Sequence, residues 1–270
     1  MPHRPLGLAH FTVLEVPPPE LVSLAARIGY ATVGLRLIRG APGTPYYPTP
    51  AGSPEMRDLK RRLDDTGIRV HDVEIATIDE AFSAAQLTGV LESAAEFGAR
   101  TLSVCGDDPD PARLTAKFVD LCDLAAGFGI GVDLEWMAWR RVRTLADALA
   151  VVTAADHPNG AVLVDALHLT RTGSAPKDLR IVPPGLIRSA QLCDARAEAP
   201  TTTEEIIREA RSGRLPPGMG VLPLGALLAE LPIDAAVSLE VPMGTSRPPE
   251  ERAGQVFAAM QTLLQRHGPS

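Results

Sequence analysis

The chain has 270 residues, of which 45% are hydrophobic, and this length and composition suffice for one large core. The net charge of −7, the pI of about 5.4 and the scattered basic residues exclude a nucleic-acid scaffold, because phosphate binding needs Lys/Arg-rich faces. No stretch approaches the roughly 18 apolar residues of a membrane span, and the first residues lack a signal peptide's apolar core. We therefore expect a cytoplasmic protein that acts on a small molecule, without nucleic-acid or membrane partners; a homo-oligomer is compatible with these features.

Cysteine usage agrees with a reducing compartment. Cys105, Cys122 and Cys193 are odd in number and form no C-x-x-C pair. A disulfide framework or a zinc ribbon needs paired cysteines. We expect all three to be reduced side chains that pack in the core.

Strand-like and helix-like stretches alternate along the whole chain. Eight apolar runs have the length and composition of strands: residues 6–12, 32–38, 69–78, 101–107, 131–137, 160–168, 189–195 and 235–242. Helical periodicity occupies residues 17–29, 53–67, 84–99, 110–129, 145–157, 202–213, 223–231 and 249–268, and it is poorly defined at 178–186.

This alternation predicts the fold. Eight units of strand followed by helix indicate an α/β protein, a single (β/α)8 TIM barrel domain that spans residues 1–270. A doubly wound open sheet is the alternative, but it would normally place a glycine-rich phosphate turn after its first strand. Residues 10–20 contain no such turn.

Four of the later strands each carry one oxygen-bearing side chain at or near the C-terminal end: Glu135, Asp165, Gln191 and Glu240. The carboxyl ends of barrel strands meet on one face, so these side chains should converge. A carboxylate among Val, Leu and Ala is unfavourable to bury unless a cation or a hydrogen-bond donor compensates it. The pattern predicts a metal site.

The expected ligands are three carboxylates and one amide oxygen. This hard set suits Mn²⁺ or Mg²⁺, with Co²⁺, Ni²⁺ and Zn²⁺ as alternatives. A divalent ion there would chelate a hydroxyl and a carbonyl of a ketose-like substrate and stabilise an enediolate. Glu135 and Glu240 are the candidate bases, one removing a proton and the other returning it to the opposite face or to the adjacent carbon.

A different interpretation of the same acids is a set of buried ion pairs with a barrel arginine. Arg36, Arg69 and Arg100 are the candidates for that partner. On this interpretation the carboxylates are structural and bind no metal.

Further side chains are placed to reach a substrate. His168 follows Asp165 by three residues and is a candidate proton donor, and Asp194 follows Gln191 by three and is a candidate partner for it. An apolar wall for a sugar ring is expected from the tryptophans at 136 and 139. The substrate-binding candidates are His10, Arg36, His71, Trp136 and Arg196.

Together these motifs resemble the xylose isomerase-like TIM barrels, the sugar phosphate isomerase/epimerase group, over residues 6–267. The resemblance rests on Glu135 in DLEWM, Asp165 and His168 as D-x-x-H, Gln191 and Asp194 in QLCDA, the R-x-x-P-G-M-G turn at 214–220, and Glu240 in SLEVP. It implies a divalent metal held by the same four side chains, with the two glutamates also serving in proton transfer.

The sequence departs from some branches of this family. Ketose 3-epimerases and inosose-type members commonly have histidine at the position of Gln191, whereas hydroxypyruvate isomerase-like members and bacterial 3-dehydroshikimate dehydratases have glutamine. Met219 stands where the P-G-x-G turn usually carries an acid. The endonuclease branch needs many histidines for three zinc ions, and this chain has 6.

Three functions are open from the sequence. The first is a metal-dependent isomerase or epimerase of a small keto sugar or hydroxy-keto compound. The second is a lyase of the 3-dehydroshikimate dehydratase type, in which His168 protonates a departing hydroxyl. The third is a non-catalytic barrel that binds a metabolite. An acid substrate would call for an arginine at the mouth, for which the candidates are Arg36, Arg69, Arg140, Arg141 and Arg196.

Overall fold

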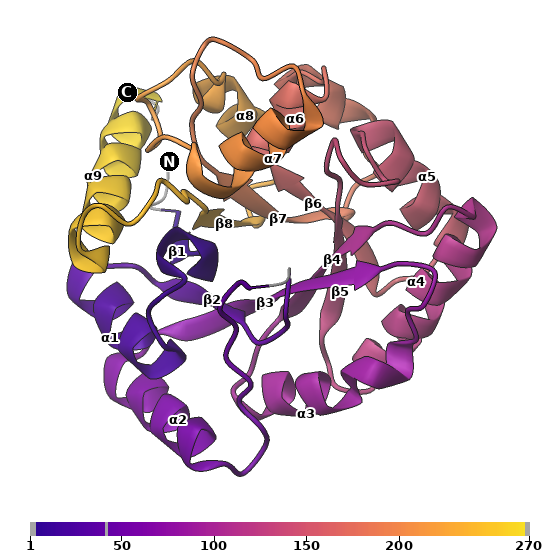
Figure 1. The fold of residues 1–270 in the computed structure, drawn as a ribbon, viewed down its shortest axis with the longest axis horizontal. Coiled ribbons are helices and arrows are strands. Elements are labelled where there is room, and N and C mark those ends of the chain that lie inside the picture. Colours follow the sequence, from indigo (N-terminus) through magenta and orange to yellow (C-terminus); the bar gives the residue numbers. More distant parts are fainter. Residues whose placement is uncertain (1–3, 41–42, 268–270) are drawn as a thin grey trace.

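The computed structural model describes residues 4–40 and 43–267. Eight parallel strands close into a barrel in chain order, and β1 pairs with both β2 and β8. Figure 1 shows the helices as a ring around these strands. The predicted (β/α)8 architecture is confirmed.

Each strand falls on a predicted run. The strands are β1 (Leu6–Leu8), β2 (Thr32–Arg36), β3 (Arg69–Ile78), β4 (Thr101–Gly106), β5 (Gly131–Glu135), β6 (Gly160–Asp165), β7 (Ile187–Leu192) and β8 (Ala236–Leu239). Parallel strands that are covered by helices are buried on both sides, which is why they read as nearly continuous apolar runs.

Apart from α6, the helices also agree with the predicted periodicity. They are α1 (Pro18–Ile28), α2 (Pro54–Thr66), α3 (Thr88–Glu96), α4 (Pro111–Ala126), α5 (Leu145–Ala155), α6 (Ala166–Arg171), α7 (Thr203–Ser212), α8 (Leu224–Glu230) and α9 (Pro249–His267), with 3-10 turns η1 (His10–Val13), η2 (Ala84–Leu87) and η3 (Pro176–Ile181). The poorly defined stretch at 178–186 contains the end of η3. None of the helices in the described ranges is long and apolar enough to cross a membrane.

One boundary differs in a way that matters for the site. The run at 160–168 was expected to be a strand throughout, but β6 ends at Asp165 and α6 begins at the next residue. The Asp165 side chain caps that helix, because its Oδ1 accepts a hydrogen bond of 2.9 Å from the His168 backbone N–H. The cap turns the chain and brings both side chains to the same edge of the barrel.

The lower part of the barrel interior is polar. Asp133 accepts hydrogen bonds from Ser189 Oγ at 2.6 Å and from Arg188 Nη2 at 2.9 Å. His71 Nε2 lies 3.0 Å from the same serine oxygen. The Asp72 carboxylate has no hydrogen-bond partner among the described residues, and burial, followed by the charges of nearby acids, raises its pKa well above the usual value.

The outer core lies between the strands and the helix ring. Leu, Val and Ile side chains fill it, and Phe118 and Met56 are fully buried there. Cys105, Cys122 and Cys193 are buried free thiols, as predicted from their number and spacing.

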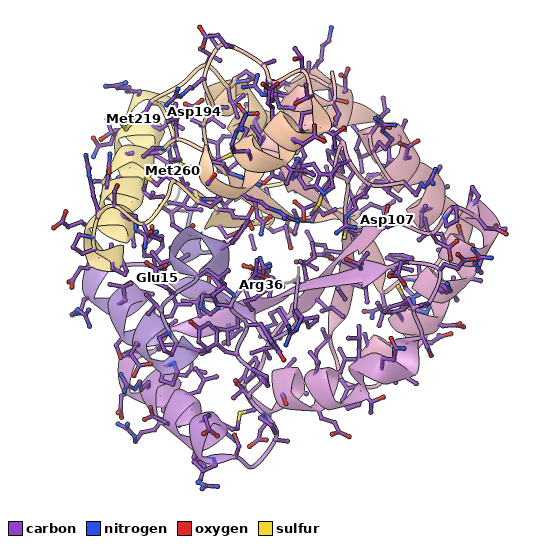
Figure 2. All side chains as sticks on the ribbon, viewed as in Figure 1. Glu15, Arg36, Asp107, Asp194, Met219 and Met260 are labelled. Atoms are coloured by element: carbon purple, nitrogen blue, oxygen red, sulfur yellow. The ribbon has the colours of Figure 1, made fainter. Side chains whose placement is uncertain are left out.

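Asp194 fastens the loop that follows α7. Its buried carboxylate accepts hydrogen bonds of 2.9 Å from the backbone N–H groups of Ala195, Gly218, Gly220 and Leu222. Its own backbone pairs with Leu215 in both directions. Figure 2 shows Asp194 beside Met219 of this loop. The Asp194 carboxylate therefore binds the backbone of this loop and not Gln191, which was its predicted partner. By holding the loop it sets the position of Arg214.

We expect Asp194→Ala to lower the free energy of unfolding by about 3 to 5 kcal/mol, because it leaves several buried N–H groups without an acceptor. Urea unfolding monitored by circular dichroism measures this. Asp120→Ala, at an exposed position of α4, is the matched control and should change stability by less than about 0.5 kcal/mol. Equal effects of the two substitutions would contradict the anchoring role.

Candidate functional site

A cavity opens at the C-terminal ends of the strands. The predicted acids Glu135 and Glu240 line it, together with Gln191 and His168. Arg36 also lines it, and Figure 2 shows this side chain near the centre of the helix ring. This is the face on which TIM barrels carry their active sites.

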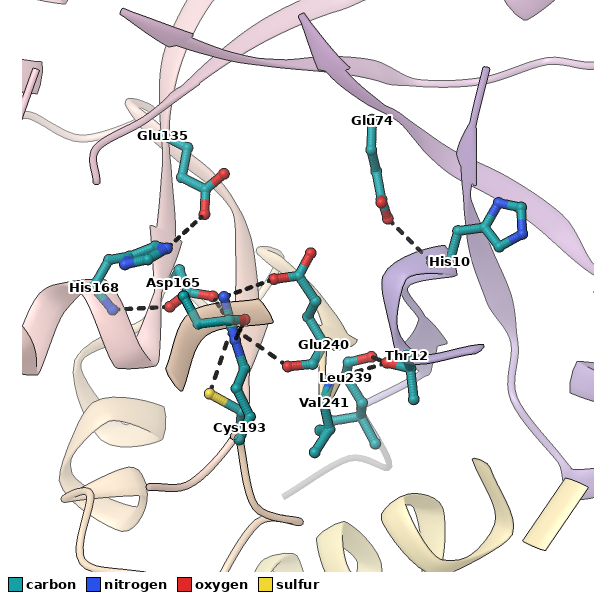
Figure 3. A network of polar contacts seen from close by, with 12 residues as sticks. His10, Thr12, Glu74, Glu135, Asp165, His168, Cys193, Leu239, Glu240 and Val241 are labelled. Atoms are coloured by element: carbon teal, nitrogen blue, oxygen red, sulfur yellow. Dashed lines mark hydrogen bonds and ion pairs between the residues drawn. The ribbon is translucent and has the colours of Figure 1, made fainter. Parts of the chain in front are cut away.

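Arg214 joins two of the four predicted metal ligands. Its Nη1 lies 2.5 Å from Asp165 Oδ2, and its Nη2 lies 3.0 Å from Glu240 Oε2. The guanidinium is buried, and its Nε donates to the backbone oxygen of Ala210 at 2.9 Å. Figure 3 shows Asp165, Glu240 and Cys193 converging on this group. Ion pairing with an arginine does occur, but through Arg214 and not through Arg36, Arg69 or Arg100.

Glu135 lies on the other side of Asp165, close to His168. The His168 Nε2 atom is 3.6 Å from Glu135 Oε1. Figure 3 marks this contact with a dashed line. One ligand atom from each of Glu135, Asp165 and His168 can be chosen so that all lie within 4.8 Å of one another. His168, which the sequence indicated as a proton donor, thus belongs to the group of potential ligand atoms, whereas Glu240 is not part of it.

The donor atoms at this point fit a divalent cation. The buried Gln191 Oε1 has no hydrogen-bond partner in the described part of the chain. Burying an amide oxygen without a partner is unfavourable unless a hydrogen-bond donor or a metal ion reaches it. Two carboxylates, an imidazole and a free amide oxygen form a set that Mn²⁺, Co²⁺ and Zn²⁺ all accept.

Negative charge exceeds positive charge around the cavity floor. Burial and the neighbouring charge of Glu240 raise the pKa of Glu135 well above its usual value. Burial also raises the pKa of Glu240 to about 7, against the opposing effect of Arg214. Burial alone would raise the pKa of Asp165 too, but the Arg214 guanidinium and His168 hold it below its usual value. A further cation would relieve this imbalance.

His168 is neutral near pH 7. Burial lowers its pKa to about 4, even though Asp165 acts in the opposite direction. A neutral imidazole has a free nitrogen lone pair, which a protonated ring lacks. His168 can therefore act as a metal ligand, or as a hydrogen-bond donor to a substrate oxygen.

Among the substrate-binding candidates, the structure brings only Arg36 to the cavity. Two nitrogens of its guanidinium donate to the same oxygen of Glu74: Nε lies 3.3 Å and Nη2 2.9 Å from Oε2. His10 lies behind it and stacks on Tyr47 at 5.2 Å between ring centroids. The His10 Nδ1 accepts the backbone N–H of Arg36 at 2.9 Å, so this ring positions the arginine.

The other three candidates do not line the cavity. His71 lies lower in the barrel beside Ser189, because it comes near the start of β3. Trp136 follows β5 and is fully buried in the core, whereas Trp139 lines the cavity. Arg196 is exposed. Contact of these three side chains with a substrate stays a prediction, because a place in or near a strand does not by itself fix how deep in the barrel a side chain lies or which way it points.

Two residues of the site were not singled out from the sequence. Glu74 lies in β3 between Val73 and Ile75, the same pattern of an acid within an apolar run that revealed Glu135. Arg214 was noted only as the first residue of a turn. Its pairing with two acids depends on how the loop folds back over the barrel.

The sequence matches the family described as xylose isomerase-like TIM barrel over residues 22–263, and the chain belongs to this family. No curated protein sequence matches the chain. Solved structures share its fold at low identity. The IolI protein with a bound zinc atom has a TM-score of 0.78 at 18% identity, over 98% of this chain and 100% of that one.

Two further solved structures carry enzyme names. The 3-keto-D-glucoside 4-epimerase YcjR from E. coli has a TM-score of 0.71 at 16% identity, over 97% of this chain and 99% of that one. The probable 3-DHS dehydratase AsbF from Bacillus anthracis has a TM-score of 0.72 at 12% identity, over 95% of this chain and 98% of that one. At these identities the likeness establishes the fold alone.

The buried ring of His10 predicts a pH dependence of stability. Burial lowers its pKa to about 4, while the unfolded chain has a histidine pKa near 6.5. The stabilisation is therefore complete above about pH 6.5 and is lost as the pH falls toward 4, a loss of about 3 kcal/mol.

His10→Asn keeps an acceptor for the Arg36 N–H but removes the titrating ring. We expect a smaller loss of unfolding free energy between pH 6.5 and 4 than in wild type, measured by urea denaturation at several pH values. Part of the dependence should remain, because His168 acts in the same direction. His157→Asn, a partly exposed position beside Asp123, is the control and should retain the wild-type dependence. Identical profiles for wild type and His10→Asn would refute this role.

Proposed function

We propose that the protein is a divalent-metal-dependent isomerase or epimerase of a small keto sugar or hydroxy-keto compound. The observation that carries this proposal is the grouping of Glu135, Asp165 and His168 beside the partnerless oxygen of Gln191, at the floor of the cavity. Membership of the xylose isomerase-like family and the epimerase among the structural neighbours support the same class of reaction.

Glu135, Asp165 and Gln191 would hold the metal, with His168 or Glu240 completing the set. A divalent cation bound there acidifies the proton next to a substrate carbonyl and stabilises the negative charge that develops. Mn²⁺ and Mg²⁺ suit the oxygen ligands, while the imidazole of His168 also suits Zn²⁺ and Co²⁺. The zinc in the structure of the IolI protein supports including zinc.

Proton transfer is assigned to the two glutamates. Both line the cavity, and they come from β5 and from the end of β8, which are well separated around the ring. Glu240, with a pKa of about 7, can accept a proton and release it again near neutral pH. Removal by one glutamate and return by the other from the opposite face inverts a carbon centre. Return to the adjacent carbon moves the carbonyl.

Arg214 is assigned a positioning role in this scheme. It binds the outer oxygens of Asp165 and Glu240, so it fixes both carboxylates relative to one another. A charged guanidinium also keeps Asp165 ionised, as a metal ligand must be.

A lyase of the dehydratase type is the second candidate. Its support is the place of His168, whose Nε2 lies 3.6 Å from Glu135 Oε1, so that a base and a proton donor stand side by side. Loss of a hydroxyl needs a donor of this kind, and the probable dehydratase AsbF has the same fold. A non-catalytic metabolite-binding barrel is the third candidate, and it needs neither metal nor proton transfer.

Metal content tests the proposed ligand group. After removal of metals and dialysis against Mn²⁺, wild type should retain about one ion per chain by elemental analysis, and Asp165→Asn should retain almost none. Asp79→Asn, at an exposed position at the end of β3, is the control and should bind as wild type. Equal retention by all three proteins would remove Asp165 from the ligand set, and no retention by any would favour the non-catalytic barrel.

Isotope exchange tests the glutamates. With Mn²⁺ in deuterium oxide, wild type should incorporate deuterium next to the carbonyl of its substrate, screened by NMR among ketoses and hydroxy-keto acids. Glu240→Gln should fold normally and lose turnover by about 10²-fold or more, the usual effect of removing a general base.

The product of the reaction separates the candidate functions. An isomer of the substrate indicates an isomerase or epimerase, and an unsaturated product that has lost water indicates the lyase. Glu92→Gln, exposed on α3, is the matched control and should turn over normally. Wild-type turnover by Glu240→Gln would overturn the mechanism with two glutamates.

A further inference from the structure

One wall of the cavity presents hydrogen-bond donors without acceptors. It consists of Trp139 and Arg140, from the segment after β5, and Arg211 near the end of α7, all of which line the cavity. The acids of the floor do not satisfy these groups. Glu135 and Glu240 interact with His168 and Arg214, and Glu74 interacts with Arg36.

Arg140 has one edge of its guanidinium held and another edge free. Its Nη1 donates to Asp107 Oδ2 at 2.7 Å, and the other oxygen of that aspartate accepts the Arg141 backbone N–H at 3.1 Å. The Arg140 Nε is buried, and neither it nor Nη2 has a hydrogen-bond acceptor in residues 4–40 or 43–267. Arg36 uses the same two nitrogens of its guanidinium, Nε and Nη2, to bind Glu74 in the same cavity. Asp107 therefore positions a two-pronged donor that lacks its anion.

Trp139 adds a neutral donor next to it in the chain. Its indole Nε1 is buried and has no hydrogen-bond partner within the described ranges. The ring packs edge-on against His168 at 5.2 Å between centroids, so the indole stands between the catalytic floor and Arg140. A buried N–H of this kind is unfavourable unless an acceptor reaches it.

Arg211 adds a second positive charge to this wall of the cavity. This residue is exposed at the cavity, and it has no ion pair or hydrogen bond with the part of the chain that the structure describes. The neighbouring charges that act on it are Arg140 and Arg36, both positive. Burial and then these two guanidinium groups lower the pKa of Arg211. Like charges brought together at a cavity favour an anion between them.

We propose that the substrate carries an anionic group, a carboxylate or a phosphate ester, which Arg140 and Arg211 bind at the mouth of the cavity. This inference rests on the proposed function in one respect: the hydroxy-ketone end of the same molecule faces Glu135 and Glu240 on the floor. The anionic end forms a two-pronged contact with Nε and Nη2 of Arg140, while Arg211 neutralises the remaining charge. The substrate is then a sugar acid, a hydroxy-keto acid or a sugar phosphate, and a neutral sugar leaves the Nε and Nη2 edge of Arg140 and the charge of Arg211 without an anion.

Anion binding can be measured without turnover. The probes are D-erythronate for the carboxylate, inorganic phosphate for the phosphate, and erythritol as the neutral counterpart of erythronate. The full chain is kept free of metal with a chelator, so that failure of the proposed catalysis leaves the result unaffected. A probe at about ten times its dissociation constant should raise the midpoint of thermal unfolding by about 3 °C.

We expect one or both anions to produce this shift in wild type, and erythritol to produce none. Erythronate alone would identify a carboxylate subsite, and phosphate alone a phosphate subsite. Arg140→Gln and Arg211→Gln should each reduce the shift by at least half. Arg140→Lys, which keeps the charge but not the two-pronged geometry, should also reduce it. Arg141→Gln, an exposed neighbour whose backbone N–H alone contacts Asp107, is the matched control and should shift as wild type.

Two results would overturn the anion subsite. The first is the absence of a shift with both anions in wild type. The second is a wild-type shift in the Arg140→Lys and Arg211→Gln proteins, each shown by circular dichroism to be folded. The protein could also bind an anion through Arg140 but show no affinity for a metal. That result would support the anion subsite and would contradict the proposed catalysis.

Discussion

The buried guanidinium of Arg214, held between Asp165 and Glu240, is the interaction on which the site depends. The carboxylates of Glu135, Asp165 and Glu240, at the ends of β5, β6 and β8, cannot all remain ionised in the barrel unless cations compensate them. Arg214 neutralises part of that charge, and Arg36 neutralises Glu74. The remaining negative charge lies around Glu135 and Asp165, where the ligand atoms of the proposed metal site gather.

The position of Arg214 in turn depends on interactions outside the cavity. Asp194 collects backbone N–H groups from the following loop and pairs with Leu215, the residue next to Arg214. On the opposite side, His10 accepts the backbone N–H of Arg36. Arg214 and Arg36 are thus each set by a buried group outside the cavity. Preorganised charges of this kind do not have to rearrange when a substrate or transition state develops its own charge.

The sequence predicted the strands and the acids well, because both follow from local patterns. Buried parallel strands read as apolar runs, and an acid at the end of such a run has to lie at the barrel mouth, as Glu135 does. Arg214 could not be assigned in this way, since its partners are 49 and 26 residues distant in the chain and are reached through a loop. The cavity lining was harder to predict, because spacing indicates the strand but not the depth or direction of a side chain. His71 comes near the start of β3 and lies beside Ser189, and Trp136 follows β5 with its side chain in the core.

The central claim is that a divalent cation binds among Glu135, Asp165, His168 and Gln191. Anomalous diffraction from crystals soaked in Mn²⁺ tests it most directly, because it locates the ion and does not depend on knowing the substrate. The account predicts one strong peak within coordination distance of Glu135 and Asp165, with Gln191 or His168 beside it. A peak elsewhere would contradict the account, for example a peak beside Asp72 deeper in the barrel. The absence of any peak near Glu135, with the Arg214 ion pairs still in place, would also contradict it.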